Sequence, residues 1–539
     1  MRLKLLLLCI ASALLLCAAW PPWGFSPLIF IAFLPLLLVQ HIVSGDNRLR
    51  AKHLFVYAYI TFLIWNSVVT WWVWNSSAGG AMLAFLVNSL LMTLVFLVFH
   101  KVKRNLPERL GNFVFIPVWI SFEYLHLDWD LSWPWLTLGN VFAEDFKWIQ
   151  WYEYTGVFGG SLWVLLVNVL LFELYVHRNT LLRPVKKKII HATAVTLLIV
   201  VPIVVSYLLF NVSSITTQPQ GIDVVVVQPN VDPYKKFNGN YQEDLNNMLA
   251  LAASKADTNT DYMVFPETAI VENLWENEIN NTWSVNRVRE FAKAYPNTTI
   301  VFGASTAYQF MPGEPHTASA RKFEKHDIWY EYYNTALQFD KSAEIKIYHK
   351  SKLVPGVEQL PYPAIFGLLG ELAIDMGGTT GTLGKQEERT VFESDNGKVA
   401  PVICYESIYG SYVGEYVRNG AEYIFIITND GWWGNTPGYK QHLLYGRLRA
   451  IETRKAIARS ANTGISCFIN TRGEIEQPQP WWNARAIKQR IASQPGLTFY
   501  VRFGDYIAVL LLIVTAIATS WAAVRWYLRR RKRNAAAAH

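Results

Sequence analysis

The sequence is short of the features that mark several common protein classes. Only four of its 539 residues are Cys, and no pair of them has metal-ligand spacing, so neither a disulfide framework nor a zinc site is predicted. No Gly-x-Ser-x-Gly motif and no Gly-rich phosphate loop occurs, which argues against a serine hydrolase and a nucleotide-binding enzyme. At least one Cys is left as a candidate reactive thiol.

Charged residues are scarce inside a series of long apolar runs, and 52% of the whole chain is hydrophobic. A helix needs about 20 apolar residues to cross roughly 30 Å of hydrocarbon. We therefore expect eight membrane-spanning helices, near 3–20, 24–43, 54–74, 80–100, 112–127, 158–177, 189–210 and 505–527. The fifth run is short and contains Glu123 and His126, which makes it the weakest of the series.

Lys and Arg are nearly absent from alternate loops, such as 75–79 and 128–157. They cluster instead around positions 2–4, 48–52, 101–109, 178–188 and 529–533. Because cytoplasmic loops retain positive charge, both termini are predicted to be cytoplasmic and 211–504 to lie outside. The same pattern accounts for the net charge of +8 without invoking nucleic acid.

The first run has a second interpretation. Arg2 and Lys4 precede a leucine-rich stretch that ends at Cys17, as in a cleavable signal or a lipoprotein signal. However, Leu16 stands where a small residue is wanted, and further apolar runs follow at once. The first run is therefore interpreted as an uncleaved helix.

Residues 220–500 have mixed composition and alternate β-rich with helical patterns. Strands are predicted at 222–227, 262–265, 299–303, 336–339, 344–348, 399–403 and 423–428, and helices at 241–254, 284–294, 407–418 and 440–458. This alternation predicts a layered α/β sandwich. The chain is thus divided into a membrane domain (1–210), a catalytic domain (220–500), and a last helix with a basic tail (505–533).

Three reactive side chains follow apolar strands in the catalytic domain. Glu267 lies in VFPET, Lys350 ends IYHK, and Cys404 lies in VICYES. Strand ends present reactive groups on rigid backbone beside an open turn. Taken singly, each is more typical of a solvated turn residue or, for Cys, of a small core residue.

Taken together and in this order, the three residues and their flanking motifs resemble the nitrilase superfamily of carbon–nitrogen hydrolases. The flanking membrane segments, with one after the domain, resemble more specifically the apolipoprotein N-acyltransferases. Segments that carry the resemblance include WPWLTLGN (133–140), YTGVFGGSLW (154–163), VVQPNVDPYKKF (226–237), TNDGWWG (428–434) and 441–466. The resemblance implies an αββα sandwich carried by eight transmembrane helices.

The resemblance also implies roles for the site residues. Cys404 is the expected nucleophile, Glu267 the general base, and Lys350 the cation that stabilises the oxyanion together with a backbone N–H after Cys404. A helix N-terminus at 407–418 is expected to favour the thiolate. Glu358 matches the family's second glutamate, and Tyr405 and Glu406 match positions that support the nucleophile.

Two departures from the family pattern affect the expected substrate fit. The family commonly reads LVPFGE, whereas this chain reads LVPGVE at 353–358. A tryptophan common after the first strand is matched here at best by Phe237.

The function implied by the resemblance is transfer of a fatty acyl chain from a membrane phospholipid, through a thioester on Cys404, to the α-amine of a diacylated lipoprotein. No cofactor and no metal are implied. Two alternatives are a membrane-tethered amidase or nitrilase, which would use water as acceptor, and a non-catalytic membrane scaffold or transporter.

Several other residues have both a structural and a functional interpretation. The apolar segment 360–372 is either a helix packed on the catalytic domain or a lid that dips into the bilayer surface. Trp133 and Trp135 are interfacial anchors or line a lipid path. Cys467 is expected to pack in a strand. A set of polar residues on one predicted helix is expected to form structural ion pairs: His442, Arg447, Arg449 and Glu452.

Overall fold

A computed structural model of the chain describes all residues except 47, 179–184, 213–220, 238, 324–326, 343, 360, 363–381 and 538–539. The described residues form two compact units. The first contains residues 1–71, 81–211 and 505–539, and the second contains 72–80 and 212–504. Most of the segment 360–372 lies outside the described residues, so the packed-helix and lid interpretations of it both stay untested.

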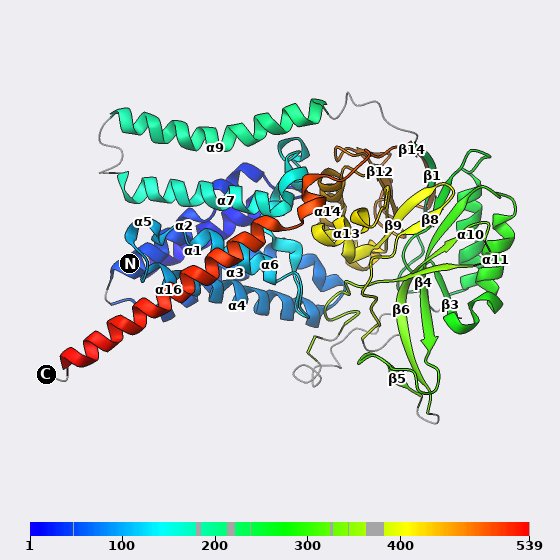
Figure 1. The fold of residues 1–539 in the computed structure, drawn as a ribbon, viewed down its shortest axis with the longest axis horizontal. Helices are drawn as coiled ribbons and strands as arrows, with labels where there is room; N and C mark the ends of the chain where they lie inside the picture. Colours follow the sequence, from blue (N-terminus) through cyan, green and yellow to red (C-terminus); the bar gives the residue numbers. More distant parts are fainter. Residues whose placement is uncertain are drawn as a thin grey trace. The chain divides into compact units, whose positions relative to one another are not determined.

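The first unit consists of helices (Figure 1). Its elements are α1 (Arg2–Ala19), η1 (Ser26–Ile31), α2 (Leu34–Gly45), α3 (Ala51–Val69), α4 (Ala78–Lys103), α5 (Glu108–Gly111), α6 (Phe115–Leu125), η3 (Pro134–Leu136), η4 (Leu138–Ala143), η5 (Phe146–Trp148), α7 (Tyr152–Val176), α9 (Val185–Val212) and α16 (Tyr506–Ala537). Buried polar side chains inside these helices bond locally. Thr61, for example, donates to the carbonyl of Tyr57 at 3.1 Å, and Asn168 donates to the carbonyl of Val164 at 2.9 Å.

Six helical segments among the described residues are long and apolar enough to cross a membrane, rather than the eight that the sequence predicted. They are Arg2–Ala19, Ser26–Gly45, Ala78–Lys103, Tyr152–Val176, Lys186–Val212 and Tyr506–Asn534. The predicted run 112–127 forms a helix of only 11 residues, α6, whose Ser121 hydroxyl bonds to that of Thr515 on α16 at 2.8 Å. The run 54–74 lies mainly in α3, which has 19 residues but carries several Tyr, Trp and polar side chains that lower its apolarity.

The second unit is built on two sheets. The eight-stranded sheet contains β1 (Ile222–Gln228), β2 (Tyr262–Val264), β3 (Ile270–Trp275), β4 (Thr299–Gln309), β5 (Arg321–Lys322), β6 (Trp329–Phe339), β7 (Lys346–His349) and β14 (Arg485–Ile491). The six-stranded sheet contains β8 (Phe392–Ser394), β9 (Gly397–Ile403), β10 (Tyr423–Thr428), β11 (Ile457–Ala461), β12 (Cys467–Ile469) and β13 (Ile475–Glu476). The predicted packing of Cys467 in a strand is confirmed, since this residue is fully buried in β12.

The two sheets face each other and helices cover their outer faces (Figure 1). The ring of Tyr262 on β2 meets that of Phe425 on β10 at 5.1 Å, and the Ser460 hydroxyl on β11 donates to the carbonyl of Val227 on β1 at 2.7 Å. Helices α10 (Tyr241–Ala253) and α11 (Trp283–Ala292) pack on the first sheet, and α13 (Gly410–Arg418) and α14 (Pro437–Thr453) on the second. The sandwich is therefore layered αββα.

Two predicted helix boundaries were wrong. The helix predicted at 407–418 begins only at Gly410, because residues 404–408 form a separate 3-10 turn, η8. The helix predicted at 440–458 ends at Thr453, where Arg454 adopts a left-handed conformation (φ 54°) and lets the chain enter β11. Four further short helical segments lie in the described part of this unit: η2 (Trp71–Asn75), whose first residue belongs to the first unit, η6 (Glu276–Asn281), η9 (Asp430–Trp433) and α15 (Phe499–Phe503).

Candidate functional site

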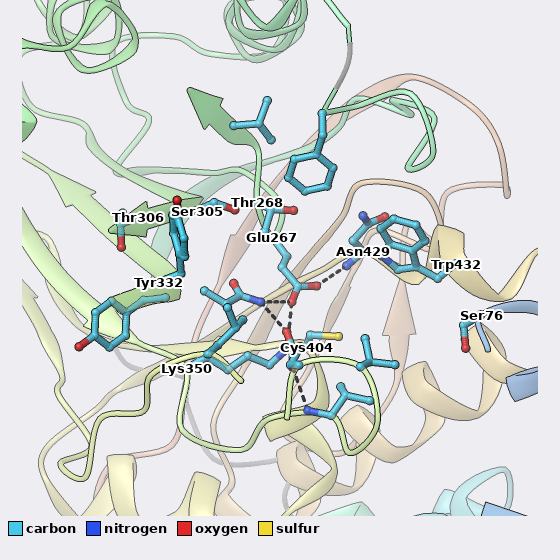
Figure 2. A pocket seen from close by; sticks show the side chains of 18 of the residues that line it. Ser76, Glu267, Thr268, Ser305, Thr306, Tyr332, Lys350, Cys404, Asn429 and Trp432 are labelled. Carbon is cyan, nitrogen blue, oxygen red and sulfur yellow. Dashed lines mark hydrogen bonds and ion pairs between the residues drawn. The ribbon is translucent and has the colours of Figure 1, made fainter. Parts of the chain in front are cut away.

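A pocket of about 240 Å³ opens at the carboxyl ends of the central strands, where the chain leaves the two sheets. Glu267, Lys350 and Cys404 line it, although they are distant in the sequence (Figure 2). Glu358 lines it as well. Strands β1, β2 and β4 run parallel in one sheet, as do β9, β10 and β11 in the other. Parallel strands end at one edge of a sheet, so the facing edges bring these side chains together.

Glu267 lies three residues after β2, in a tight connection that passes close to β4. The approach requires a glycine at position 303, because a Cβ there would lie 2.5 Å from the carbonyl oxygen of Pro266 and 2.6 Å from the Cα of Glu267. Thr268 has a left-handed backbone (φ 47°), which turns the chain away after the carboxylate. The VFGA motif of β4 thus shapes the backbone that presents Glu267.

Lys350 follows β7 directly, and its side chain is 1% exposed. Its ammonium nitrogen Nζ lies 3.0 Å from Oε1 of Glu267 and 2.8 Å from Oε1 of Glu358. The side-chain amide of Asn334 donates to the same two oxygens, at 2.7 and 2.9 Å. The backbone N–H of Lys350 donates to the carbonyl of Asn334 at 2.8 Å. One lysine and one asparagine therefore hold both carboxylates.

The turn that carries Glu358 explains how this chain can read LVPGVE at 353–358 where the family commonly reads LVPFGE. The carboxylate of Glu358 accepts the N–H of Val354 at 2.9 Å, and the N–H of Glu358 donates to the carbonyl of Val354 at 2.9 Å. Gly356 has φ 77°, a conformation that favours glycine. The glycine of this sequence thus stands where the turn needs it, and Glu358 still reaches Lys350.

Cys404 begins η8 at the end of β9 and has a left-handed backbone (φ 49°). Its carbonyl oxygen lies 2.7 Å from the Ser407 hydroxyl, which donates to it, and 3.0 Å from Nε2 of His442. A sharp turn therefore follows the strand. The element at Cys404 is a five-residue 3-10 turn rather than the N-terminus of the helix predicted at 407–418, which begins only at Gly410.

The electrostatics of the pocket favour a resting thiol beside a carboxylate. Burial would raise the pKa of Glu267, but the Lys350 ammonium and hydrogen bonds from Asn334, Lys350 and the Cys404 thiol lower it below its usual value. Burial lowers the pKa of Lys350, yet Glu267 and Glu358 outweigh it and raise that pKa well above normal. Burial and the Glu267 carboxylate raise the pKa of Cys404 well above normal. A proton acceptor is thus held next to a thiol that needs one.

Glu406 and Tyr405 lie just beyond the nucleophile and are both buried. Oε1 of Glu406 accepts the hydroxyl of Tyr348 and the hydroxyl of Tyr412, each at 2.7 Å, and the N–H of Ser351 at 2.7 Å. Oε2 of Glu406 accepts the N–H of Ile403 at 2.8 Å. Glu406 therefore ties the turn of Lys350 to the turn of Cys404. The ring of Tyr405 packs on that of Tyr409 at 5.3 Å.

A second buried ionic cluster, which we call the rear cluster, consists of Asp430, His442 and Arg459. Asp430 accepts Nη2 of Arg459 at 2.7 Å and lies 2.9 Å from Nδ1 of His442. Burial would raise the pKa of Asp430, but Arg459 and His442 lower it to about 2. His442 was expected to form a structural ion pair, and it pairs with Asp430 and also approaches the carbonyl of Cys404. Arg449 and Glu452 form the second expected ion pair, at 2.9 Å.

Several residues of the site were not identified from the sequence. Asn334 lies on β6, and nothing in its local pattern separates it from other strand residues. The N–H of Asn429 donates to Oε2 of Glu267 at 2.9 Å, and the position of Asn429 after β10 was a usable signal, because strand ends meet here. Lys236 is 2% exposed and donates to the carbonyl of Glu267 at 3.1 Å and to the Thr268 hydroxyl at 2.8 Å. Burial lowers the pKa of Lys236 to about 7.

No group of three or more His, Cys, Asp or Glu side chains with metal-binding geometry occurs in the part of the chain that the structure describes. The groups that line the pocket include a thiol, three carboxylates, an ammonium, amides and hydroxyls. This set is suited to nucleophilic attack on a carbonyl with proton transfer.

Comparisons with known proteins match both halves of the chain. Residues 12–170 match the model of the apolipoprotein N-acyltransferase N-terminal domain, and residues 223–494 match that of carbon-nitrogen hydrolases. Apolipoprotein N-acyltransferase of Chlorobaculum tepidum is 30% identical over 95% of this chain and 96% of its own length. That of Geobacter metallireducens is 26% identical over 96% of this chain and 95% of its own length.

Among solved structures, a nitrilase-superfamily member from Saccharomyces cerevisiae matches with 17% identity and a TM-score of 0.37, covering 51% of this chain and 91% of that one. The sequence matches extend over the helical unit and the sandwich alike. On these matches, the chain belongs to the apolipoprotein N-acyltransferase family.

Proposed function

We propose that the protein transfers a fatty acyl group from a membrane phospholipid to the α-amine of the N-terminal diacylglyceryl-cysteine of lipoproteins, through a thioester on Cys404. The observation that carries the proposal is the convergence of the Cys404 thiol, the Glu267 carboxylate and the Lys350 ammonium in one pocket. The names of the full-length relatives supply N-acyl transfer and an apolipoprotein as acceptor, and the phospholipid donor is part of the proposal. No cofactor takes part in the proposed reaction.

In the first half-reaction, Glu267 removes the proton from the Cys404 thiol as the sulfur attacks the ester carbonyl of the phospholipid. The developing oxyanion is stabilised by Lys350 and by the backbone N–H of Tyr405. When the intermediate collapses, the ester C–O bond breaks and the alkoxide of the lysophospholipid takes the proton from Glu267. The products are a thioester on Cys404 and a free lysophospholipid.

In the second half-reaction, the neutral α-amine of the lipoprotein attacks the thioester carbonyl, and Glu267 accepts a proton from the nitrogen. The C–S bond then breaks, an amide is formed, and the sulfur of Cys404 recovers its proton from Glu267. Both half-reactions need a base that is ionised at neutral pH, which agrees with the lowered pKa of Glu267.

The remaining buried groups act on the geometry of these three. Glu358 holds the ammonium of Lys350 at 2.8 Å, and the side-chain amide of Asn334 holds the carboxylates of Glu267 and Glu358 on either side of it. Glu406 fixes the two turns that carry Lys350 and Cys404. The ring of Tyr405 supports the nucleophile by packing. These are positioning roles, separate from the oxyanion contact proposed for the backbone N–H of Tyr405.

We further propose that the chain spans the bacterial inner membrane eight times, with both termini in the cytoplasm and the sandwich in the periplasm. Residues 72–80 follow α3 and belong to the compact unit of the sandwich, so they lie on its side of the membrane. The basic residues 48–52 precede α3 and favour the opposite side. Helix α3 must then cross the bilayer despite its lower apolarity. The basic residues 101–109 favour the cytoplasmic side, so the segment of α6 that follows them must cross the bilayer as well.

The test is the intact mass of the purified protein after exposure to phospholipid. We expect an added fatty acyl group that hydroxylamine removes and that the Cys404→Ser variant does not acquire. Addition of a diacylated lipopeptide should then discharge the adduct and yield a triacylated product. Discharge to free fatty acid at the same rate without lipopeptide would favour a hydrolase, and absence of any adduct on the wild-type protein would exclude the thioester and favour a non-catalytic scaffold.

A further inference from the structure

The segment Trp72–Gly80 connects α3 to α4 in the sequence, yet it belongs to the compact unit of the sandwich. Three hydrogen bonds attach it there. Nε1 of Trp72 donates to the side-chain carbonyl of Gln441 at 3.1 Å, Nδ2 of Asn75 donates to the carbonyl of Trp433 at 2.9 Å, and the carbonyl of Asn75 accepts the hydroxyl of Tyr234 at 3.3 Å. We call this segment the strap.

The indole of Trp72 anchors the strap in a fitted position. Trp72 is 1% exposed, and its ring meets the ring of Trp433 edge-on at 4.8 Å. Gly438 on α14 makes room for it, because a Cβ at that position would lie 2.5 Å from the indole. Such complementarity between positions more than 360 residues apart in the sequence indicates a specific docking of the strap.

The docked strap reaches the catalytic pocket at Ser76, which lines it together with Trp432, Trp433 and Phe237. In Figure 2, Ser76 and Trp432 lie on one side of Cys404, and Tyr332 and Thr306 lie on the other. The pocket therefore extends in two directions from the nucleophile. Beside Ser76 lie the indole rings of Trp432 and Trp433, which have no hydroxyl group, whereas the other side has the hydroxyl-bearing side chains of Tyr332 and Thr306. The less polar side suits an alkyl chain.

We propose that the strap forms a wall of the acyl-binding side of the pocket and that the small side chain at position 76 sets the length of acyl chain admitted. This inference rests on the proposed function, since it concerns the donor of the same thioester. The hydroxyl of Ser76 donates to the carbonyl of Val73 at 2.9 Å, so it is already engaged within the strap. The contribution of Ser76 is therefore its small volume rather than a polar contact with substrate.

The test compares variants at two neighbouring strap positions. Ser76→Trp fills the acyl side of the pocket, whereas Ala78→Trp adds the same group at an exposed position that does not line it. Each purified full-length protein is given phospholipids with 8-carbon or 16-carbon chains, and the rate of Cys404 acyl adduct formation is followed by intact mass. A Ser76→Ala variant keeps a small side chain without the hydroxyl.

We expect Ser76→Trp to lower the ratio of the 16-carbon to the 8-carbon rate by about tenfold or more, a typical size for steric discrimination in an apolar pocket. Ala78→Trp and Ser76→Ala should keep the wild-type ratio. An unchanged ratio in Ser76→Trp, or an equally altered ratio in either control, would contradict the proposal that the side chain at position 76 sets the acyl chain length. If the wild-type protein forms no adduct at all, the proposed function fails, which is a different result from an unchanged ratio.

Discussion

Two buried ionic clusters flank Cys404, and they differ in what they can reach. The pocket cluster of Glu267, Lys350 and Glu358 lines the cavity beside the thiol. The rear cluster of Asp430, His442 and Arg459 is at most 1% exposed, and none of its members is among the described residues that line the pocket. Nε2 of His442 lies 3.0 Å from the backbone carbonyl of Cys404, and Asp430 adds to the effects of burial and Glu267 that raise the pKa of the Cys404 thiol.

The comparison shows that a buried charge pair with a shifted pKa does not by itself identify a catalytic group. Asp430 and Glu267 both have lowered pKa values caused by a neighbouring cation. Only Glu267 also lies where a substrate can arrive. The pocket cluster should therefore govern the rate of acylation, and the rear cluster should govern the stability of the turn that carries Cys404.

The largest effect is expected for Glu267→Gln. Loss of the general base should slow acyl adduct formation by about 10²–10⁴. The Glu267 carboxylate raises the pKa of Cys404 while Lys350 lowers it, so removing the carboxylate should lower the thiol pKa. The midpoint of iodoacetamide alkylation against pH should thus move to lower pH although acylation is lost. The control is Glu278→Gln, because Glu278 is exposed. An alkylation midpoint that moves to higher pH in Glu267→Gln would contradict the expected effect of the Glu267 carboxylate on the pKa of Cys404.

A large effect of another kind is expected for Asp430→Asn. Removing one partner of a buried charge pair leaves Arg459 uncompensated, at a cost of about 3–5 kcal/mol of stability. The thermal midpoint of the purified protein should fall, while acylation per folded molecule stays near wild type. A normal thermal midpoint combined with lost acylation would mean that the rear cluster takes part in the reaction. The two clusters would then not differ in role.

Lys350→Met should slow acylation by about 10²–10³, as expected for the loss of an oxyanion donor. The pH profile provides a second readout. Because Lys350 lowers the pKa of Glu267, its removal should raise that pKa, so the base becomes protonated at a higher pH and the acidic limb of the residual rate moves upward. An unmoved limb would mean that Lys350 does not control the base.

The smallest effect is expected for Glu406→Gln. An amide keeps one acceptor oxygen but loses the charge-assisted bonds to Tyr348 and Tyr412, and we expect acylation to slow by about tenfold. Tyr412→Phe, which removes only one of those donors, should slow it less. A loss as large as that of Glu267→Gln would mean that Glu406 takes part in the reaction itself.

Much of the architecture could be predicted from sequence patterns, since it depends on local periodicity. The strands at 222–227 and 423–428 are short apolar runs, and both are present. The limits of such reasoning appear where neighbouring elements compete for the same residues. The helix predicted at 440–458 loses its last residues because β11 pairs with β10 from Ile457 onward.

Hydropathy and strand-end motifs are local properties of the chain, so the residue pattern was enough to predict six apolar helices, several strands and the three reactive side chains. Which buried groups share an environment became visible only in the folded chain. Asn334, Lys236 and the N–H of Asn429 reach Glu267 from separate elements, and the strap reaches the pocket from between two helices. Charges and hydrogen bonds act over a few ångströms, and distance along the chain does not predict distance in space.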